Sequence, residues 1–284
     1  MKTIQLSLMA TSALAALSLA SVAQAGPVEA GRWAVSGSIG TEVPVSGDVH
    51  GGTTTGEIPL AALASLRDAG APALPSALTA TGNAGQLRIQ SRGFDDIYDN
   101  ATALNLEATY GIGGGREVFG NFDYVKADEG TTQVGTAAVV NGTNTVAEVA
   151  VYGRFGEYKG MGVSVGVRQW FNEGGTFEPY IAGRIGASKI DEIRATFTVP
   201  DLTINQSLRD VPFYDDTTVL TAGFEAGVSY KMSENVSLIA ETGLRYYGKL
   251  DGNDSAIGGL GLASINEEGS RLVVPVTLKL RAVF

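Results

Sequence analysis

The carboxyl-terminal segment, residues 272–284, alternates between apolar and other side chains without a break. From Leu272 every second residue is apolar as far as Phe284, while Lys279 and Arg281 stand at positions in between. Successive side chains of a β-strand point to opposite faces. The segment therefore predicts a strand with one continuously apolar face and one face that carries two cations.

Seven further segments alternate in the same way. Most of the eight are roughly nine to twelve residues long, close to the roughly 9–11 residues of a tilted membrane-spanning strand. Strands of soluble proteins are usually about 5–6 residues long. The predicted strands are 32–40, 103–112, 117–126, 161–171, 177–188, 220–230, 236–247 and 273–284.

The connections between these segments are alternately long and short. Three short ones, around 113–116, 172–175 and 231–234, are rich in turn residues, and four long ones cover about 41–102, 127–160, 189–219 and 248–270. A sandwich has no reason to show this pattern, whereas an up-and-down barrel with turns at one rim and loops at the other does. The sequence predicts an all-β, eight-stranded, antiparallel up-and-down transmembrane β-barrel. Its three short turns would be periplasmic and its four long loops extracellular.

The amino-terminal residues indicate export. Lys2 is the only charge in the first 25 residues, an apolar stretch follows it, and Ala23-Gln24-Ala25 fits a cleavage site. We expect a signal peptide at 1–25, cleaved near Ala25-Gly26, and a barrel domain at 26–284. No later apolar run approaches the roughly 20 residues of a membrane-spanning helix, which leaves a soluble exported protein or an outer-membrane barrel.

Composition excludes some partners. The chain has 20 Lys and Arg against 30 Asp and Glu, a formal net charge of −10. A nucleic-acid-binding protein needs a basic surface, so we expect no nucleic-acid partner. Cysteine is absent, so neither disulfides nor a lipid attached to cysteine are expected. No motif calls for a cofactor.

The charged faces of the predicted strands allow two arrangements. Turned outward, they would surround a soluble barrel with an apolar core; turned inward, they would line a membrane barrel. Strand length, loop alternation, the export signal and the terminal aromatic residue favour the second. On that register the lumen carries Glu107, Asp123, Arg168, Arg184, Glu225, Glu241, Arg245, Lys279 and Arg281.

These lumen charges have two interpretations. They could line a water-filled pore of weak selectivity, or they could form interlocked ion pairs that fill the barrel. Unpaired charges are costly in a narrow interior, and eight strands barely leave room for side chains. We prefer the interlocked network.

Three features resemble the small outer-membrane β-barrel family of the OmpA-transmembrane and opacity-protein type. They are the segment PYIAGRIGAS (179–188), the closing strand that ends on Phe284, and the eight-strand, four-loop plan. The resemblance covers essentially the whole chain after the signal peptide. It implies contact with outer-membrane lipid and lipopolysaccharide, and it implies that Phe284 is part of the signal read by the barrel-assembly machinery.

Three functions stay open. The one we favour is a monomeric barrel with a non-enzymatic envelope-structural or surface-binding role, through long extracellular loops that meet an unknown ligand. The second is a narrow porin-like channel for small solutes or ions. The third is an outer-membrane lipid-modifying enzyme, with His50, the only histidine, as general base. His50 lies in a Gly/Thr-rich stretch without an assignable nucleophile, so we predict a solvated loop histidine, no catalytic residues and no enzyme.

An acidic motif in the last long loop resembles the start of a calcium loop. Asp251, Asn253 and Ser255 have the opening spacing of such a loop, but Leu262 stands where the closing glutamate would fall. We therefore predict a solvated acidic rim and no metal site.

The first long loop contains one helical pattern. Leu60, Leu63 and Leu66 recur at helical spacing within 58–70, and Gly70 follows them. This pattern predicts a short amphipathic helix that packs locally.

Overall fold

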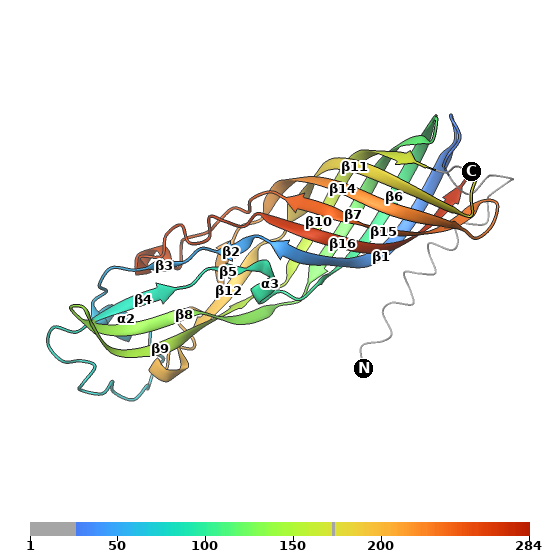
Figure 1. Ribbon diagram of the computed structural model, residues 1–284. Coiled ribbons are helices and arrows are strands. Elements are labelled where there is room, and N and C mark those ends of the chain that lie inside the picture. Colours follow the sequence, from blue (N-terminus) through green and yellow to red (C-terminus); the bar gives the residue numbers. More distant parts are fainter. Residues whose placement is uncertain (1–26, 172–173) are drawn as a thin grey trace, which may run out of the picture.

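Eight long strands close into an antiparallel barrel in the order β1-β16-β15-β14-β11-β10-β7-β6 (Figure 1). The computed structural model describes residues 27–171 and 174–284, so the predicted signal peptide lies outside it. The bounds are β1 (Trp33–Ser46), β6 (Ala101–Gly113), β7 (Arg116–Ala127), β10 (Tyr158–Trp170), β11 (Phe177–Ile190), β14 (Thr217–Lys231), β15 (Val236–Tyr247) and β16 (Arg271–Val283). All eight predicted strands and the up-and-down order are confirmed. None of the helices in the described residues is long and apolar enough to cross a membrane.

The two ends of the barrel differ in their connections. At what we call the turn end, residues 114–115 join β6 to β7, residues 232–235 join β14 to β15, and residues 171–176 join β10 to β11. Residues 172 and 173 of the last connection are among those not described. Gly114 and Gly115 have φ values of 63° and 67°, a left-handed conformation that favours glycine and permits a two-residue turn. The four long connections lie at the opposite end, the loop end.

The long connections are folded rather than irregular, which the sequence did not predict. We call them the loop-end region; it comprises residues 47–100, 128–157, 191–216 and 248–270. It contains a six-stranded sheet of order β13-β12-β9-β8-β4-β3 and a two-stranded sheet β2-β5. Its elements are β2 (Asp48–His50), β3 (Thr53–Thr54), α2 (Leu60–Ser65), β4 (Ala84–Ile89), β5 (Arg92–Gly93), α3 (Phe94–Ile97), β8 (Gly130–Asn141), β9 (Asn144–Phe155), β12 (Ile193–Thr198), η2 (Pro200–Leu202), β13 (Val211–Tyr214) and η3 (Gly258–Leu260). The predicted short helix is confirmed as α2, which buries Leu63.

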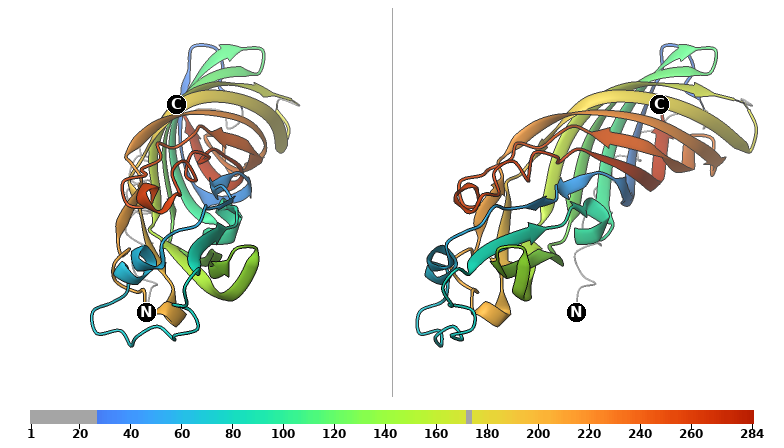
Figure 2. Two further views of the ribbon diagram at one scale, coloured as in Figure 1. Left: turned by 90° about the vertical axis from the view of Figure 1, so that its left-hand side faces the viewer. Right: turned by 60° about the vertical axis from the view of Figure 1, so that its left-hand side comes forward.

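The loop-end region continues directly from the barrel wall. Figures 1 and 2 show it projecting from one mouth of the barrel, so that the molecule is elongated. Four strand pairs, β7/β8, β9/β10, β11/β12 and β13/β14, are each interrupted by only two residues. All but one of these gap residues are acidic: Asp128, Glu129, Gly156, Glu157, Asp191, Glu192, Asp215 and Asp216. Four barrel strands are thus separated by these mostly acidic pairs, which we call the acidic level, from strands of the six-stranded sheet, which we call the upper sheet.

The distribution of side chains reverses near this level. Along β7, Phe122 is exposed on the outer wall and Asp123 is buried in the lumen, but Val125 is then buried and Lys126 points outward. The same change occurs along β10 and β11, where the outward residues near the loop end are Lys159 and Lys189. Between the change and the turn end, charged side chains lie inside and apolar side chains outside, as the sequence predicted. Between the change and the loop end, the apolar side chains lie inside.

The largest hydrophobic core lies above that change. It starts at the barrel mouth with inward residues such as Val125 and Val273, includes Phe94 of α3, and reaches Phe155 and Phe213 in the upper sheet. The long connections fold because they remove these apolar side chains from water, and burial of apolar surface stabilises the folded state.

Candidate functional site

The lumen below the apolar core is filled by charged side chains. All nine residues predicted to face it are buried in the barrel. They are joined by Glu42, Glu117 and Arg271, which were not predicted. These twelve residues form one group near the turn end and a second group near the loop end. Three acids and three bases make up each group: Glu107, Glu117, Glu241, Arg168, Lys279 and Arg281 in the first, and Glu42, Asp123, Glu225, Arg184, Arg245 and Arg271 in the second.

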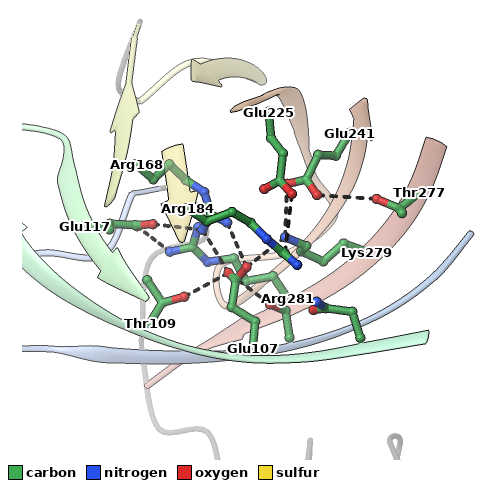
Figure 3. A network of polar contacts seen from close by, with 12 residues as sticks. Glu107, Thr109, Glu117, Arg168, Arg184, Glu225, Glu241, Thr277, Lys279 and Arg281 are labelled. Carbon is green, nitrogen blue, oxygen red and sulfur yellow. Dashed lines mark hydrogen bonds and ion pairs between the residues drawn. The ribbon is translucent and has the colours of Figure 1, made fainter. Parts of the chain in front are cut away.

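Glu107 is the centre of the turn-end group (Figure 3). Both guanidinium nitrogens of Arg168, Nη1 and Nη2, donate to its two carboxylate oxygens at 2.9 Å each. Nζ of Lys279 donates to it at 2.9 Å and to Glu241 at 3.1 Å. A two-pronged guanidinium–carboxylate contact fixes orientation as well as charge, so Arg168 is held inside the barrel, reaching from β10 past β7 to β6.

Glu117 completes this group at its turn-end side. It accepts hydrogen bonds from Arg168 at 3.2 Å, from Arg281, and from the backbone N–H of Val28 at 2.7 Å. It thereby ties the segment before β1 to the lumen. Glu178 is also buried here and accepts a hydrogen bond from the backbone of Gly174.

Aromatic rings occupy the space that the ion pairs leave. The guanidinium carbon of Arg168 lies 4.8 Å from the ring centre of Phe119 and 4.6 Å from that of Tyr180. The Trp170 ring lies 4.6 Å from Tyr180 and 5.1 Å from the guanidinium of Arg281. Cations over ring faces are attracted most strongly where water is excluded, so the rings both fill the lumen and support its charges.

The loop-end group is built around two arginines that cross the lumen. Arg184 Nη2 lies 2.7 Å from Asp123, and its Nη1 lies 3.4 Å from Glu225. Arg245 donates to Glu42 and to Glu225, each at 2.8 Å. Together they bridge β7, β11, β14, β15 and β1 at one level of the barrel.

Arg271 closes this level toward the loop end. Its guanidinium carbon lies 3.6 Å from the ring centre of Tyr158, 4.2 Å from that of Tyr247 and 5.4 Å from that of Phe94. Its Nη2 lies 3.7 Å from a Glu42 oxygen. Because Phe94 belongs to α3, a helix of the loop-end region covers the mouth of the barrel.

The two groups are each electrically balanced. Each carries three acids and three bases, and Glu178 is a further acid buried at the turn-end side. Nε of Arg168, Arg245, Arg271 and Arg281 has no hydrogen-bond partner among the described residues. Buried donors of this kind are positions that single water molecules can occupy.

The three missed residues carry a signal in the sequence. Glu117 has the same strand parity as Asp123, so both face the lumen. Glu42 and Arg271 continue the inward alternation of β1 and β16, but they fall just outside the predicted strands 32–40 and 273–284. Extending each alternation by a few residues would have found them.

The predicted solvated position of His50 is wrong. Its side chain is only 1 % exposed, because β2 passes through the core of the loop-end region. The ring stacks on Phe155 at 5.9 Å and meets the edge of Phe213 at 6.3 Å. Desolvation by burial lowers the pKa of the His50 imidazole. In the described part of the chain, the His50 imidazole makes no hydrogen bond to a nucleophile or a carboxylate, and the Ser91 hydroxyl donates only to the backbone carbonyl of His50, at 3.1 Å.

The acidic motif of the last long connection takes part in loop contacts. Asp251 accepts a hydrogen bond from the hydroxyl of Thr217 at 2.9 Å, and Asn253 donates to Asp215 at 2.8 Å. Across the described ranges, no group of three or more His, Cys, Asp or Glu side chains is arranged to hold a metal ion.

Comparison with known proteins finds similarity only among solved structures; no family model and no curated protein matches the chain. Neisserial surface protein A is 13% identical with a TM-score of 0.41, over 89% of this chain and 97% of that chain. Ail, the attachment invasion locus protein of Yersinia pestis, is 13% identical with a TM-score of 0.36, over 90% and 99%. The outer membrane protease OmpT of Escherichia coli is 8% identical with a TM-score of 0.37, over 90% and 98%.

The first two are small outer-membrane β-barrels, the type that the sequence resembles. Identities and TM-scores this low carry no functional argument. The eight-stranded fold of this chain rests on its own strand order and register.

Proposed function

We propose that the chain is an integral outer-membrane β-barrel with a closed lumen, and that its loop-end region lies outside the cell. The outer wall of the barrel supports a membrane location. In the described strands, its outward positions between Lys126, Lys159 and Lys189 and the turn end carry no charged side chain except Arg116, the first residue of β7. Val163 and Leu220 expose 62 % and 77 % of their surface on this wall. Soluble monomers rarely expose apolar patches so extensive, and hydrocarbon would cover this one.

Aromatic pairs near the turn end support the same location. The rings of Trp33 and Tyr110 lie 5.0 Å apart, and those of Phe177 and Tyr230 lie 5.3 Å apart, on the outer wall. Membrane barrels carry such aromatic residues where the hydrocarbon meets the head groups. The turn end would then lie at the periplasmic boundary.

The lumen supports a non-enzymatic, envelope-structural or surface-binding role. The observation that carries this proposal is the pair of electrically balanced groups that occupy the barrel across its width. Transport would need a continuous path past Arg168, which is paired with an acid two strands away, and past Arg245, which also lies 3.7 Å from Asp123 on the opposite side of the barrel. The loop-end region, with its own core and sheet, is the part that would meet a partner.

Outward lysines mark the proposed contact with lipid head groups and lipopolysaccharide. Lys126 lies 2.7 Å from Glu157 and 3.3 Å from Asp128, and Lys189 lies 3.3 Å from Asp216. Lipid phosphates would meet these cations at the level where the apolar wall ends. The neighbouring acids offer oxygen ligands through which divalent cations would bridge to the same phosphates.

The terminal residue closes the barrel seam. The backbone N–H of Phe284 donates to the carbonyl of Trp33 at 3.0 Å, and its ring is half exposed on the outer wall. This exposure suits the role that the family resemblance implies for Phe284, recognition by the barrel-assembly machinery.

Single-channel recording tests the closed lumen. The purified, refolded protein in a planar bilayer should give no stable ion-conducting steps. The double variant Asp123→Ser/Arg184→Ser removes a pair without leaving a net charge, and it should open a measurable path. Removing an exterior pair with Lys126→Ser/Asp128→Ser should change nothing.

A stable, ion-selective conductance of the unmodified protein would favour the second candidate, a narrow channel. One observation speaks for that candidate, namely the partnerless Nε donors of Arg271 and Arg281 in the lumen, which water can solvate.

A further inference from the structure

One edge of β9 in the upper sheet has no strand beside it. β8 pairs with β9 from Asn144 to Phe155, whereas β12 pairs with β9 only from Tyr152 to Phe155. On the β12 side, residues 144–151 therefore have no neighbouring strand in the described part of the chain. Among the same described residues, no backbone group of this stretch makes a hydrogen bond to a turn or a loop. We call this side of residues 144–151 the open edge.

The backbone groups at the open edge can be assigned from β12. In an antiparallel sheet the N–H and C=O of one residue point to the same side, and successive residues alternate between the two sides. The N–H of Phe197 donates away from β9, so the next residue, Thr198, bonds to its partner Tyr152. Counting back from Tyr152 in steps of two, Ala150 and Glu148 direct their N–H and C=O groups to the open edge.

The other side of the sheet gives the same assignment. Leu87 of β4 makes its hydrogen bonds away from β8, so the next residue, Arg88, bonds to Thr136 of β8. The residue that follows Thr136 then faces β9, where its partner is Val149. Because Val149 bonds to β8, the residues on either side of it present their backbone groups to the open edge.

The chain itself covers the outer sides of β4 and β13. The outer side of β4 bonds to Thr55 and Ile58, and that of β13 bonds to Gly252 and Asn253. Proteins usually protect an uncovered edge with lysine, proline or a bulge. Residues 144–151 contain no lysine and no proline, and their one bulge lies near the start of β9. The rest of the open edge is therefore free to pair with another chain.

The side chains along the open edge alternate in character. Glu148 is exposed on the outer face of the sheet, where it lies 3.2 Å from Arg88. Ala147 and Val149 lie on the opposite face and are half-buried, and Val149 packs against the core of the loop-end region. A strand added here would place one residue opposite Glu148 and the residues on either side of it next to Ala147 and Val149.

We propose that the open edge binds an extended peptide of a partner protein as an added antiparallel strand, with a basic residue opposite Glu148 and an apolar residue on each side of it. In strand addition, main-chain hydrogen bonds give affinity and alternate side chains give specificity. Opposite charges directly across an antiparallel pair are stabilising, and like charges are destabilising. A second copy of residues 144–151, NTVAEVAV, has no basic residue to offer. The inference names a partner class for the loop-end region and so rests on the proposed surface-binding role.

Amide hydrogen exchange of the refolded full-length protein in lipid nanodiscs tests the proposal. Without a peptide, the amides of Glu148 and Ala150 should exchange rapidly, and that of Val149, which bonds to β8, should exchange slowly. The probe is the peptide Thr-Val-Lys-Val-Thr, blocked at both ends. At saturation it should slow exchange of the Glu148 and Ala150 amides about tenfold or more and leave Val149 unchanged.

Modified peptides separate main-chain pairing from side-chain contact. N-methylation of the lysine removes the N–H that would donate to the carbonyl of Glu148, and it should weaken binding about fivefold to tenfold. N-methylation of a valine removes an N–H that points away from β9, so this matched control should bind as the parent peptide does. Replacement of the lysine by glutamate should weaken binding about threefold to tenfold.

A variant closes the open edge in the protein itself. Proline is tolerated on an edge strand where the missing N–H faces solvent, so Ala150→Pro should fold. The peptide should then no longer protect the Glu148 amide. Ala150→Ser is the matched control, because it keeps the backbone N–H, and it should bind the peptide as the parent protein does.

Three results would overturn the proposal. The first is a failure of the peptide to slow exchange at Glu148 and Ala150 in the folded parent protein. The second is equal binding of the two N-methylated peptides, a result that does not depend on whether Ala150→Pro folds. The third is protection that rises with protein concentration in the absence of peptide, which would assign the open edge to a second copy. A conducting lumen combined with normal peptide binding would instead contradict only the closed barrel.

Discussion

The barrel and the loop-end region are made from the same hairpins, yet they place their side chains in opposite ways. On β7 and β10 the barrel turns Phe122 and Val165 outward and Asp123 and Arg168 inward. On β9, the continuation of β10, Phe155 is buried and Glu148 is exposed. Both arrangements satisfy one rule, that apolar surface avoids water and buried charge is paired. The difference lies in what surrounds each part.

The change between the two arrangements is abrupt. On β7 it occurs between Asp123 and Val125, within one step of the inward alternation. The outward lysines and the acidic gap residues follow immediately. At the proposed membrane location, the outer boundary of the hydrocarbon would lie at the point of each strand where the polarity of the two faces is exchanged.

The largest expected difference between the two regions concerns ion pairs. Glu107→Ala would leave Arg168 and Lys279 buried without their main partner, and removal of one partner of a buried pair costs about 3–5 kcal/mol. Glu148 in the loop-end region lies 3.2 Å from Arg88 at an exposed position, where a pair contributes at most about 1 kcal/mol. Urea unfolding of Glu107→Ala and Glu148→Ala in lipid bilayers measures both. Equal losses in the free energy of unfolding would mean that the lumen charges are solvated.

A second difference concerns charge on the outer surface. Val165→Lys places an ammonium group on the apolar wall of the barrel and should lower the free energy of unfolding by about 2–4 kcal/mol if hydrocarbon lies there. Val146→Lys makes the same change at an exposed position of β9, where the effect should stay within about 0.5 kcal/mol. The same unfolding assay gives both values. A barrel that tolerates Val165→Lys as well as the sheet tolerates Val146→Lys would be a soluble one.

The smallest effect lies at the acidic level between the regions. Hydrogen bonds from Lys126 and Lys159 lower the pKa of Glu157 to about 2. A carboxyl group with a lowered pKa in the folded state stabilises that state above its ordinary pKa of 4.5, and this contribution disappears as the pH falls toward 2. Carbon NMR of the Glu157 carboxyl should give a midpoint near 2, and Lys159→Gln should raise it.

Lys189→Gln is the control for that titration, because Lys189 pairs with Asp216 rather than with Glu157. A Glu157 midpoint near 4.5 in the parent protein would show that the lysines are engaged elsewhere, for instance by lipid phosphates.

The barrel could be predicted from the sequence because each of its strands meets two unlike environments. An apolar outer wall on one side and a charged lumen on the other go with a strict alternation, visible in residues 272–284 and in Phe122 against Asp123. The alternation places the nine charged residues on one face, and strand length, loop alternation and the export signal identify that face as the lumen. Glu42 and Arg271 were not predicted because they lie just outside the predicted strands 32–40 and 273–284.

The loop-end sheet could not be predicted in the same way. On β9 the buried residues Val151 and Phe155 alternate with Val146, Ala150 and Tyr152, which are apolar although they lie on the less buried face. With apolar residues on both faces, the period of two is hidden. His50 is buried against Phe155 and Phe213. Both are far from His50 in the chain, so no local sequence pattern predicts its burial.

The charges of the closing strand would matter in a last folding step in which β16 docks. Of the six lumen bases in the two groups, β16 alone carries three: Arg271, Lys279 and Arg281. Before β16 docks, the unfinished cylinder would hold all six carboxylates against only Arg168, Arg184 and Arg245. The open barrel would thus carry excess negative charge inside, and long-range attraction would bring the positively charged strand β16 into register. Added salt would screen this attraction, so the final zipping of the seam would slow as ionic strength rises.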